Sequence, residues 1–300
     1  MRPGFESPWG PPLTKLEFAA QSHGDVMESH TTAASPAILS TTIASLFPSD
    51  VVAAELRAPG DASLLLPEEA ESVANAVPKR IQEFAAGRQC ARRALAKFGV
   101  TDFPVRVARD RQPMWPEFLV GSITHTVGLC AAAVAERARV IALGLDSEVV
   151  GAVKADLWPS ICAAAELAWV DTLHPGEQAR AVAMIFSAKE AFYKCQYPLV
   201  GERLNFHDVC VRPLEWSAVH GAFAVAPARP IAFFNRFAAR LRARSSAAGP
   251  MLGYYRFHEG FVSAGAFLLA SEEASASPAT SAGALSRAAA PNRLCRRESP

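Results

Sequence analysis

Residues 186–194 of the chain read Phe-Ser-Ala-Lys-Glu-Ala-Phe-Tyr-Lys, a stretch with an apolar side and a charged side. Glu190 and Lys194 are one helical turn apart, so a helix would project them from the same face. The apolar residues around them would pack the opposite face into a core. The pattern predicts a helix over residues 177–196, which Pro198 would end. A Glu–Lys pair at this spacing is also common on ordinary solvated helices, so it indicates a site only together with further signals.

A second acidic cluster stands earlier in the chain, in Gly-Leu-Asp-Ser-Glu at residues 144–148. It follows the apolar run 140–143, and a strand would place Asp146 and Glu148 on one face because side chains alternate. The same pattern also occurs where a strand simply passes into a polar loop. If this strand end meets Glu190, three carboxylates converge with a lysine ammonium beside them. Carboxylate oxygens suit Mg²⁺, which keeps coordination positions for water and substrate phosphates.

Length and composition limit the class of protein. With 300 residues, half of them hydrophobic, the chain can bury a substantial core in one large domain or two small ones. A net charge of +1 gives no general attraction to nucleic acid or anionic membranes. The six cysteines contain no Cys-x-x-Cys pair, which argues against a zinc knuckle or a disulfide framework. Without a visible secretory signal or an apolar run long enough to span a bilayer, the sequence predicts a cytoplasmic protein.

The ends of the chain differ in composition from its middle. Residues 1–42 mix Pro, Gly, Ser, Thr and His, and residues 271–300 are rich in Ala, Ser, Thr and Pro, so we expect a flexible N-terminal extension and a disordered tail. Between them, apolar spacing predicts a helix over 79–98 that Gly99 would end. The remaining expected elements are a strand at 51–56, a hairpin of strands 129–135 and 140–145, helical segments at 155–173 and 233–244, and strands at 208–211, 222–225, 254–257 and 261–269.

The helix expected over 79–98 is rich in arginine and contains Gly87. Glycine inside a helix costs about 1 kcal/mol relative to alanine, and close approach of a backbone or a ligand is one reason to keep it. Arg88 and Arg92, one turn apart, could hold a phosphate with their planar donor groups. The same arginines are equally consistent with a solvated basic face, so both interpretations stay open here.

Further along, Pro113-Met-Trp-Pro116 predicts an extended, rigid loop, because the two prolines exclude a helix. Gly121-Ser-Ile-Thr-His125 then has the pattern of a short strand with a polar end. Thr124 and His125 offer a hydroxyl and an imidazole that could hold a phosphate or a ribose. A histidine at a strand end is more often a structural hydrogen-bonding group, so this assignment also depends on the other signals.

Four signals therefore follow one another along the chain: the arginine-rich helix around Gly87, the proline loop with its Gly-Ser-Ile-Thr-His strand, the acidic strand end at 144–148, and the Lys-Glu-Ala helix at 186–194. Together they resemble the 4′-phosphopantetheinyl transferases, in particular the siderophore-synthase type to which enterobactin synthetase component D belongs. The resemblance covers about residues 50–270. Two departures are Glu117-Phe118, where relatives usually have a turn such as Asp-Gly, and Phe186, where they often have Trp.

The resemblance implies an α+β fold in which two similar lobes form a pseudo-dimer, with coenzyme A and Mg²⁺ in the cleft between them. Residues 43–145 would form the N-terminal lobe, which binds coenzyme A. Residues 146–270 would form the C-terminal lobe, which carries the metal and the catalytic helix. The first forty residues and the tail have no counterpart in this comparison.

Roles for individual residues follow from the same resemblance. Asp146, Glu148 and Glu190 match the family's metal-binding acids, which would hold Mg²⁺ or alternatively Mn²⁺. The resemblance implies Glu190, Lys194 and Lys189 as catalytic residues, with Lys194 near the leaving diphosphate and Lys189 in the family's Lys-Glu-Ala core. The coenzyme A site would take its residues from both lobes, namely Arg80, Arg88, Arg111, Pro113, Thr124, His125, Asp146 and Lys194.

The implied reaction moves 4′-phosphopantetheine from coenzyme A to a serine of an apo acyl or peptidyl carrier protein and releases adenosine 3′,5′-bisphosphate. Glu190 or a metal-bound water would take the serine proton, and the sequence leaves both routes open. Two other functions also stay open: a catalytically silent homologue that only binds carrier proteins, and a metal-dependent phosphodiesterase that acts on coenzyme A. The expected partners include neither nucleic acid nor membrane, and a fold of two matched lobes favours a monomer.

Overall fold

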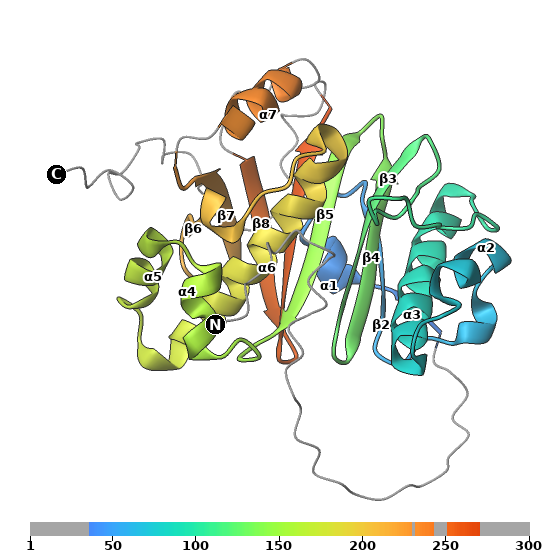
Figure 1. Ribbon diagram of the computed structural model, residues 1–300, viewed down its shortest axis with the longest axis horizontal. Helices are drawn as coiled ribbons and strands as arrows, with labels where there is room; N and C mark the ends of the chain where they lie inside the picture. Colours follow the sequence, from blue (N-terminus) through green and yellow to red (C-terminus); the bar gives the residue numbers. More distant parts are fainter. Residues whose placement is uncertain (1–35, 230–231, 243–250, 271–300) are drawn as a thin grey trace, which may run out of the picture.

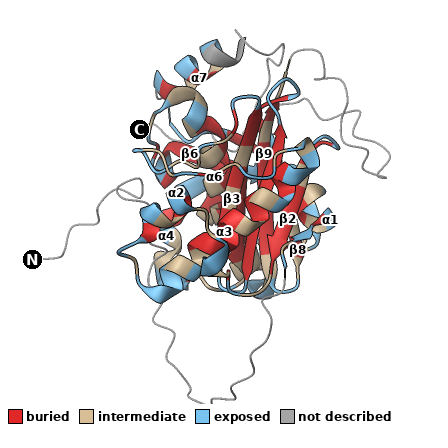
Figure 2. Cartoon of the chain, turned by 90° about the vertical axis from the view of Figure 1, so that its right-hand side faces the viewer, coloured by how far each residue is buried: buried red, intermediate tan, exposed pale blue. Residues whose placement is uncertain are grey.

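The computed structural model describes residues 36–229, 232–242 and 251–270. The expected tail at 271–300 and most of the expected N-terminal extension lie outside the described residues. The described part is a mixed helix and sheet fold with two antiparallel sheets side by side and helices packed on them (Figure 1). Most strand residues are buried, whereas the outer sides of the helices are exposed (Figure 2). Within this described part, no helix combines the length and the apolar character needed to cross a membrane.

The first sheet has four strands in the order β1-β2-β4-β3. Their bounds are Ile38–Leu39 for β1, Val52–Leu56 for β2, Leu119–Thr126 for β3 and Leu129–Glu136 for β4. Alternate residues of β4 face opposite sides: Ala132 and Val134 pack against α3 (Pro78–Leu95), while Ala131 and Ala133 pack towards α1 (Thr41–Ala44). The strand predicted at 51–56 and the helix predicted at 79–98 are confirmed. A 3₁₀ turn, Ala96–Phe98, follows α3 and ends at Gly99 in the left-handed conformation.

The second sheet has five strands in the order β5-β9-β8-β7-β6. Their bounds are Val140–Val149 for β5, Val209–Pro213 for β6, His220–Pro227 for β7, Met251–His258 for β8 and Phe261–Leu269 for β9. The long helix α6 (Pro175–Val200) crosses this sheet and buries its apolar side on it (Figure 1). Helix α7 (Ala232–Arg242) packs Phe233 and Phe237 around Phe192 of α6. All four strands predicted after α6 are confirmed.

The predicted hairpin of strands 129–135 and 140–145 is wrong. β4 pairs with β2 on one edge and with β3 on the other, so it has no edge left for β5, which pairs with β9. The chain passes between the sheets at residues 137–139, and the predicted lobe boundary after residue 145 therefore falls inside β5. The described end of the expected N-terminal extension also differs from the prediction, because Ile38–Leu39 pairs with β2.

Two helix predictions need correction. The helix expected over 155–173 is divided into η4 (Ala155–Leu157), α4 (Trp158–Ile161) and α5 (Ala164–Val170), because the extended backbone at Cys162 and Ala163 breaks it and the Glu166 carboxylate caps the new start. α6 continues past Pro198 to Val200 and ends at Gly201, where φ is 71°. A proline in the last turn removes only one hydrogen bond, so the helix tolerates it there. The other short elements are η1 (Ala62–Leu64), α2 (Pro67–Ala70), η2 (Glu71–Val73) and η5 (Phe206–Asp208).

Two contacts bring the sheets and α6 together. On the edge of the first sheet, hydroxyls of β3 accept hydrogen bonds from the β5 backbone: Ser122 Oγ from the Leu145 amide and Thr124 Oγ1 from the Ser147 amide, both at 3.0 Å. On β5 itself, Gly144 lets the backbone of α6 approach directly. A Cβ atom added to Gly144 would lie 1.9 Å from the carbonyl oxygen of Ala191. The glycine therefore fixes the distance between β5 and the half of α6 that contains residues 186–194.

We expect Gly144→Ala to lower the free energy of unfolding by about 1–3 kcal/mol, because the added methyl group must push α6 away from β5. Urea unfolding measures this. Gly176→Ala, in the first turn of the same helix, is the matched control, because a Cβ there would meet its nearest neighbour at an ordinary 3.4 Å. Equal unfolding free energies for the two variants would contradict the close contact.

Candidate active site between the two sheets

The centre of the candidate site is the carboxylate of Asp146, on β5. Lys194 of α6 donates a hydrogen bond from Nζ to Asp146 Oδ1 at 2.7 Å and another to the carbonyl oxygen of Leu145 at 3.1 Å. Thr124 of β3 donates to the same Oδ1 at 3.2 Å. Asp146 is buried, with 4% of its surface exposed. Three elements from distant parts of the sequence therefore meet at one buried carboxylate.

The second oxygen of this carboxylate has a different environment. Asp146 Oδ2 is buried and has no hydrogen-bond partner among the residues that the structure describes. A buried acceptor left without a partner is costly, so such an atom usually serves a ligand, an ion or a water molecule. Oδ2 therefore points to a group that enters this site from outside the protein.

The charge on Lys194 is held by the carboxylates around it. Burial disfavours the ammonium, but Asp146, Glu190 and Glu148 favour it more strongly, and together they raise the pKa of Lys194 above its ordinary value. Glu190 lies one turn before Lys194 on α6, and Glu148 follows Asp146 on the same face of β5. The acidic strand end and the Lys-Glu-Ala helix thus act on one ammonium. Across the described ranges, however, no three His, Cys, Asp or Glu side chains form a cluster able to hold a metal ion.

A second group of polar residues joins α3 to the end of β3. His125 Nε2 lies 3.3 Å from Glu83 Oε2, and Arg80 Nη1 lies 3.5 Å from the same oxygen. The hydrogen bond from His125 is the main reason that the pKa of Glu83 falls to about 2. The structure therefore places Arg80 and His125 together, as expected. Glu83 was not predicted as a site residue from the sequence, although its spacing three residues after Arg80 puts both on one helix face.

Arg88 and Arg92 do not form a shared phosphate grip in the structure. Arg88 is 7% exposed, stacks 3.7 Å above the ring of Phe84 and donates from Nε to the Val105 carbonyl at 3.0 Å. Burial lowers its pKa to about 10. Arg92 forms an ion pair with the fully buried Glu69. The two arginines therefore hold α3 against the segments before and after it.

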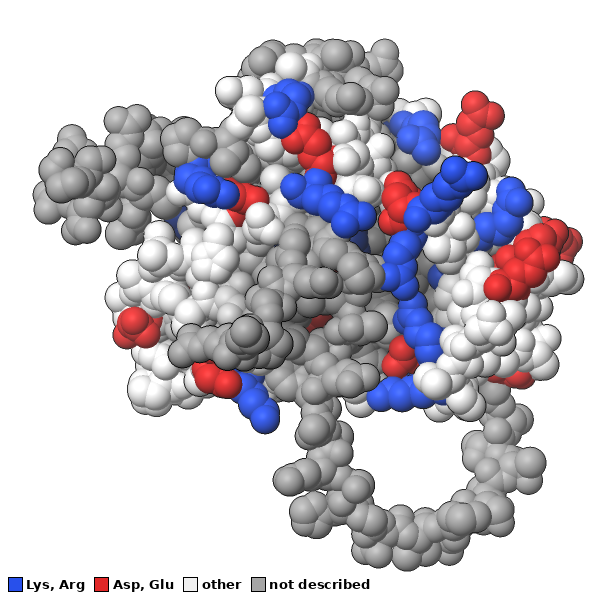
Figure 3. Space-filling view, viewed as in Figure 1, with Lys and Arg blue, Asp and Glu red and all other residues white. Residues whose placement is uncertain are grey.

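The proline loop is a tight turn in front of β3. Arg111 is exposed and has a φ of 72°, and a bridge between Val107 and Pro113 closes the turn. Beyond it, the Trp115 ring covers Gly121, where a Cβ would lie only 2.6 Å from the indole. Lys and Arg side chains form a run on this face, over the region of α3 and β3 (Figure 3). Arg111 therefore holds its guanidinium exposed in the turn that precedes β3.

Lys189 lies in the core, away from the Asp146 carboxylate, and this differs from the predicted place on the catalytic face. Its side chain is fully buried, and Nζ donates to Glu166 Oε2 at 2.6 Å. It also donates to the carbonyl oxygens of Phe206 at 2.7 Å and Ile161 at 2.9 Å. Adjacent residues of a helix point about 100° apart, and here Lys189 faces the core whereas Glu190 lies on the partly exposed side of α6.

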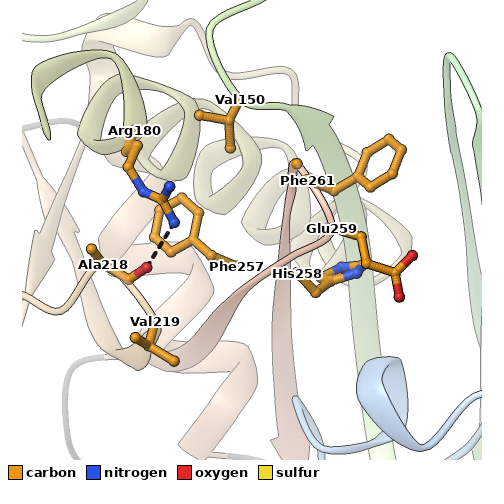
Figure 4. Close-up of a pocket in the computed structure, with 9 residues that line it drawn as sticks. Val150, Arg180, Ala218, Val219, Phe257, His258, Glu259 and Phe261 are labelled. Carbon is orange, nitrogen blue, oxygen red and sulfur yellow. Dashed lines mark hydrogen bonds between the residues drawn. The ribbon is translucent and has the colours of Figure 1, made fainter. Parts of the chain in front are cut away.

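A cavity of about 360 Å³ lies elsewhere, beyond the end of β5. Its lining includes Val150, Arg180, Phe257, His258 and Phe261 (Figure 4). Arg180 stacks on Phe257 and donates to the Ala218 carbonyl at 2.8 Å, so its charge serves the local packing. These residues differ from every residue predicted for the site.

Known proteins show the same combination of segments. Residues 68–135 match a family model described as the 4′-phosphopantetheinyl transferase N-terminal domain, and residues 142–240 match the 4′-phosphopantetheinyl transferase superfamily. The chain is 41% identical over 170 residues to the 4′-phosphopantetheinyl transferase Svp of Streptomyces mobaraensis. The aligned residues cover 55% of this chain and 69% of that protein. It is 36% identical over 172 residues to PptT of Mycobacterium tuberculosis, over 56% of this chain and 75% of that protein.

A more distant relative is enterobactin synthase component D of Salmonella typhimurium, 39% identical over 119 residues, which cover 39% of this chain and 48% of that protein. The two matched segments coincide with the two parts of the structure: the first runs from α2 to the end of β4, and the second from β5 into α7. The chain belongs to the 4′-phosphopantetheinyl transferase superfamily and is a transferase of this class.

Proposed function

We propose that this transferase moves 4′-phosphopantetheine from coenzyme A to a serine of an apo acyl or peptidyl carrier protein and releases adenosine 3′,5′-bisphosphate. The observation that carries the proposal is the meeting of Asp146, Lys194 and Thr124 at the junction of the two sheets, in a chain of this superfamily. A buried carboxylate paired with a charged ammonium is suited to a substrate whose diphosphate is cleaved, because negative charge grows on the phosphate oxygen that departs.

In this proposal Asp146, Glu148 and Glu190 hold Mg²⁺, or Mn²⁺ in its place. The unpartnered Asp146 Oδ2 and the purely carboxylate donor set fit a hard cation of this kind. When bound, the cation would neutralise part of the negative charge of the diphosphate.

The side chains of the protein would carry the proton and charge transfers. The serine hydroxyl attacks the phosphorus on the pantetheine side, and the bond from that phosphorus to the bridging oxygen breaks. Glu190 accepts the serine proton, directly or through water. Lys194, which its carboxylate neighbours keep charged, stabilises the negative charge that grows on the departing phosphate oxygen or donates a proton to it. Lys189 takes no part, because its three hydrogen bonds hold it in the core.

The coenzyme A nucleotide would lie against the first sheet. Arg80 and His125 lie together at the end of β3, and Thr124, next to His125, reaches Asp146. Arg111, exposed in the proline loop, would add a further cation for the nucleotide phosphates. Two further predicted residues, Pro113 and Arg88, would shape the pocket and contribute little direct contact, since Arg88 is mostly buried. A long helix crosses each sheet, α3 on the first and α6 on the second, and this repetition supports the proposed pseudo-dimer of two similar lobes.

Intact-mass analysis tests the function directly. The purified chain is incubated with coenzyme A, Mg²⁺ and an apo carrier protein, with parallel samples that lack carrier or contain a chelator. We expect the carrier to gain one phosphopantetheine group, and the gain to disappear with the chelator. Hydrolysis of coenzyme A without carrier would instead indicate a phosphodiesterase. Carrier binding without any mass change would indicate the catalytically silent alternative.

A further inference from the structure

A carboxylate stands where the proposed function needs positive charge. Glu83 is about one-third exposed, on the face of α3 that carries Arg80, and it reaches His125 of β3. Both of its neighbours are proposed to bind the phosphates or adenosine of coenzyme A. A negative charge at this place repels phosphate, so it requires a compensating role.

The contacts of Glu83 indicate that role. Arg80 Nη1 and His125 Nε2 lie only 3.5 Å apart. A guanidinium nitrogen is always a donor, and the hydrogen bond to Glu83 uses the His125 tautomer that carries its proton on Nε2. The two donors therefore need an acceptor beside them. Glu83 Oε2 provides it, because this one oxygen lies 3.5 Å from Arg80 and 3.3 Å from His125. Glu83 remains ionised over the working pH range, since its pKa is about 2.

We propose that Glu83 is a positioning residue of the coenzyme A site: its carboxylate holds the side chains of Arg80 and His125 side by side and so ties α3 to the end of β3. The inference rests on the proposed function, because it assumes that these two side chains contact coenzyme A. Glu83 itself touches no reacting atom. Its effect is therefore on coenzyme A binding, since an interaction far from the reacting bond contributes equally to the ground state and the transition state.

Glu83→Ala and Glu83→Gln test the proposal against wild type, with Gln82→Ala, exposed on the same helix, as the matched control. We expect Glu83→Ala to raise the KM for coenzyme A by about tenfold, the effect of losing one hydrogen bond between charged groups, with kcat changed less than twofold. Glu83→Gln keeps an acceptor oxygen, so we expect its KM for coenzyme A to lie close to the wild-type value. Melting temperatures show whether each variant is folded.

A double-mutant cycle with His125→Ala gives the second readout. If Glu83 acts through His125, Glu83→Ala adds little to the KM of the His125→Ala variant. A KM of Glu83→Gln below the wild-type KM, or full additivity of the two alanine substitutions, would overturn the positioning role. The Glu83→Gln measurement remains decisive where Glu83→Ala fails to fold. Wild-type protein that neither binds coenzyme A nor modifies a carrier would overturn the proposed function itself, which separates the two failures.

Discussion

Glu190→Ala is expected to lower the rate of phosphopantetheine transfer by at least about 10²- to 10⁴-fold, the usual contribution of a general base, with further loss if the metal is no longer held. Glu190 lies on the partly exposed face of α6, and its charge reaches Lys194. The fold should tolerate the substitution, because alanine is a good helix former and Glu190 is not part of the buried core. We therefore expect activity to disappear while the urea unfolding curve stays close to that of the wild type.

The matched control is Glu177→Ala, on the same helix but near its start, where the carboxylate accepts a hydrogen bond from Trp216. This variant should keep near-normal transfer, measured by intact mass of the carrier. If purified Glu190→Ala transferred phosphopantetheine at a rate near that of the wild type, both the metal and the base assignments for Glu190 would be wrong.

Local patterns were sufficient for much of the architecture. Strand β9 has the predicted bounds, 261–269, because its apolar run is long and lies between a turn and a polar tail. The shared face of Asp146 and Glu148 follows from alternation in a strand, and that of Glu190 and Lys194 from helical spacing. Neither rule says that the two faces meet. That expectation came from the resemblance to a family, and the Lys194–Asp146 hydrogen bond is its counterpart in the structure.

The predictions that failed concern strand pairing and side-chain burial, both of which depend on the whole fold. Two strands with a short polar connection between 136 and 139 predict a hairpin, but strand pairing is decided by which sheet edges are still open, and β2 and β3 occupy both edges of β4. A lysine next to the proposed catalytic glutamate is expected to be exposed, since lysine is almost never fully buried without a partner. The partner of Lys189, Glu166, stands 23 residues earlier in a segment that gave no separate signal.

This buried pair has the largest expected effect on stability. Glu166 is 2% exposed, and besides Lys189 its carboxylate accepts hydrogen bonds from the amides of Ala163 and Val211, both at 2.6 Å. One carboxylate thus joins the start of α5, the strand β6 and the helix α6. Lys189→Met should lower the free energy of unfolding by about 3–5 kcal/mol, because it leaves this buried carboxylate without its counter-charge. Lys194→Met, on the same helix, should abolish transfer.

The pH dependence of the unfolding free energy distinguishes two causes of the Lys189→Met deficit: loss of the ammonium charge and loss of side-chain packing. Burial raises the pKa of Glu166 above its ordinary value of 4.5, so this carboxylate takes up its proton at a higher pH in the folded protein than in the unfolded chain, and the stability falls as the pH rises above 4.5. In Lys189→Met the opposing effect of the ammonium is gone, so its stability deficit should be smaller at pH 5 than at pH 8 in urea unfolding. Glu166→Gln added to Lys189→Met should likewise recover part of the deficit at pH 8. A deficit that is the same at both pH values and unchanged in the double variant would show that Lys189 stabilises α6 through its packed hydrocarbon chain rather than through its charge.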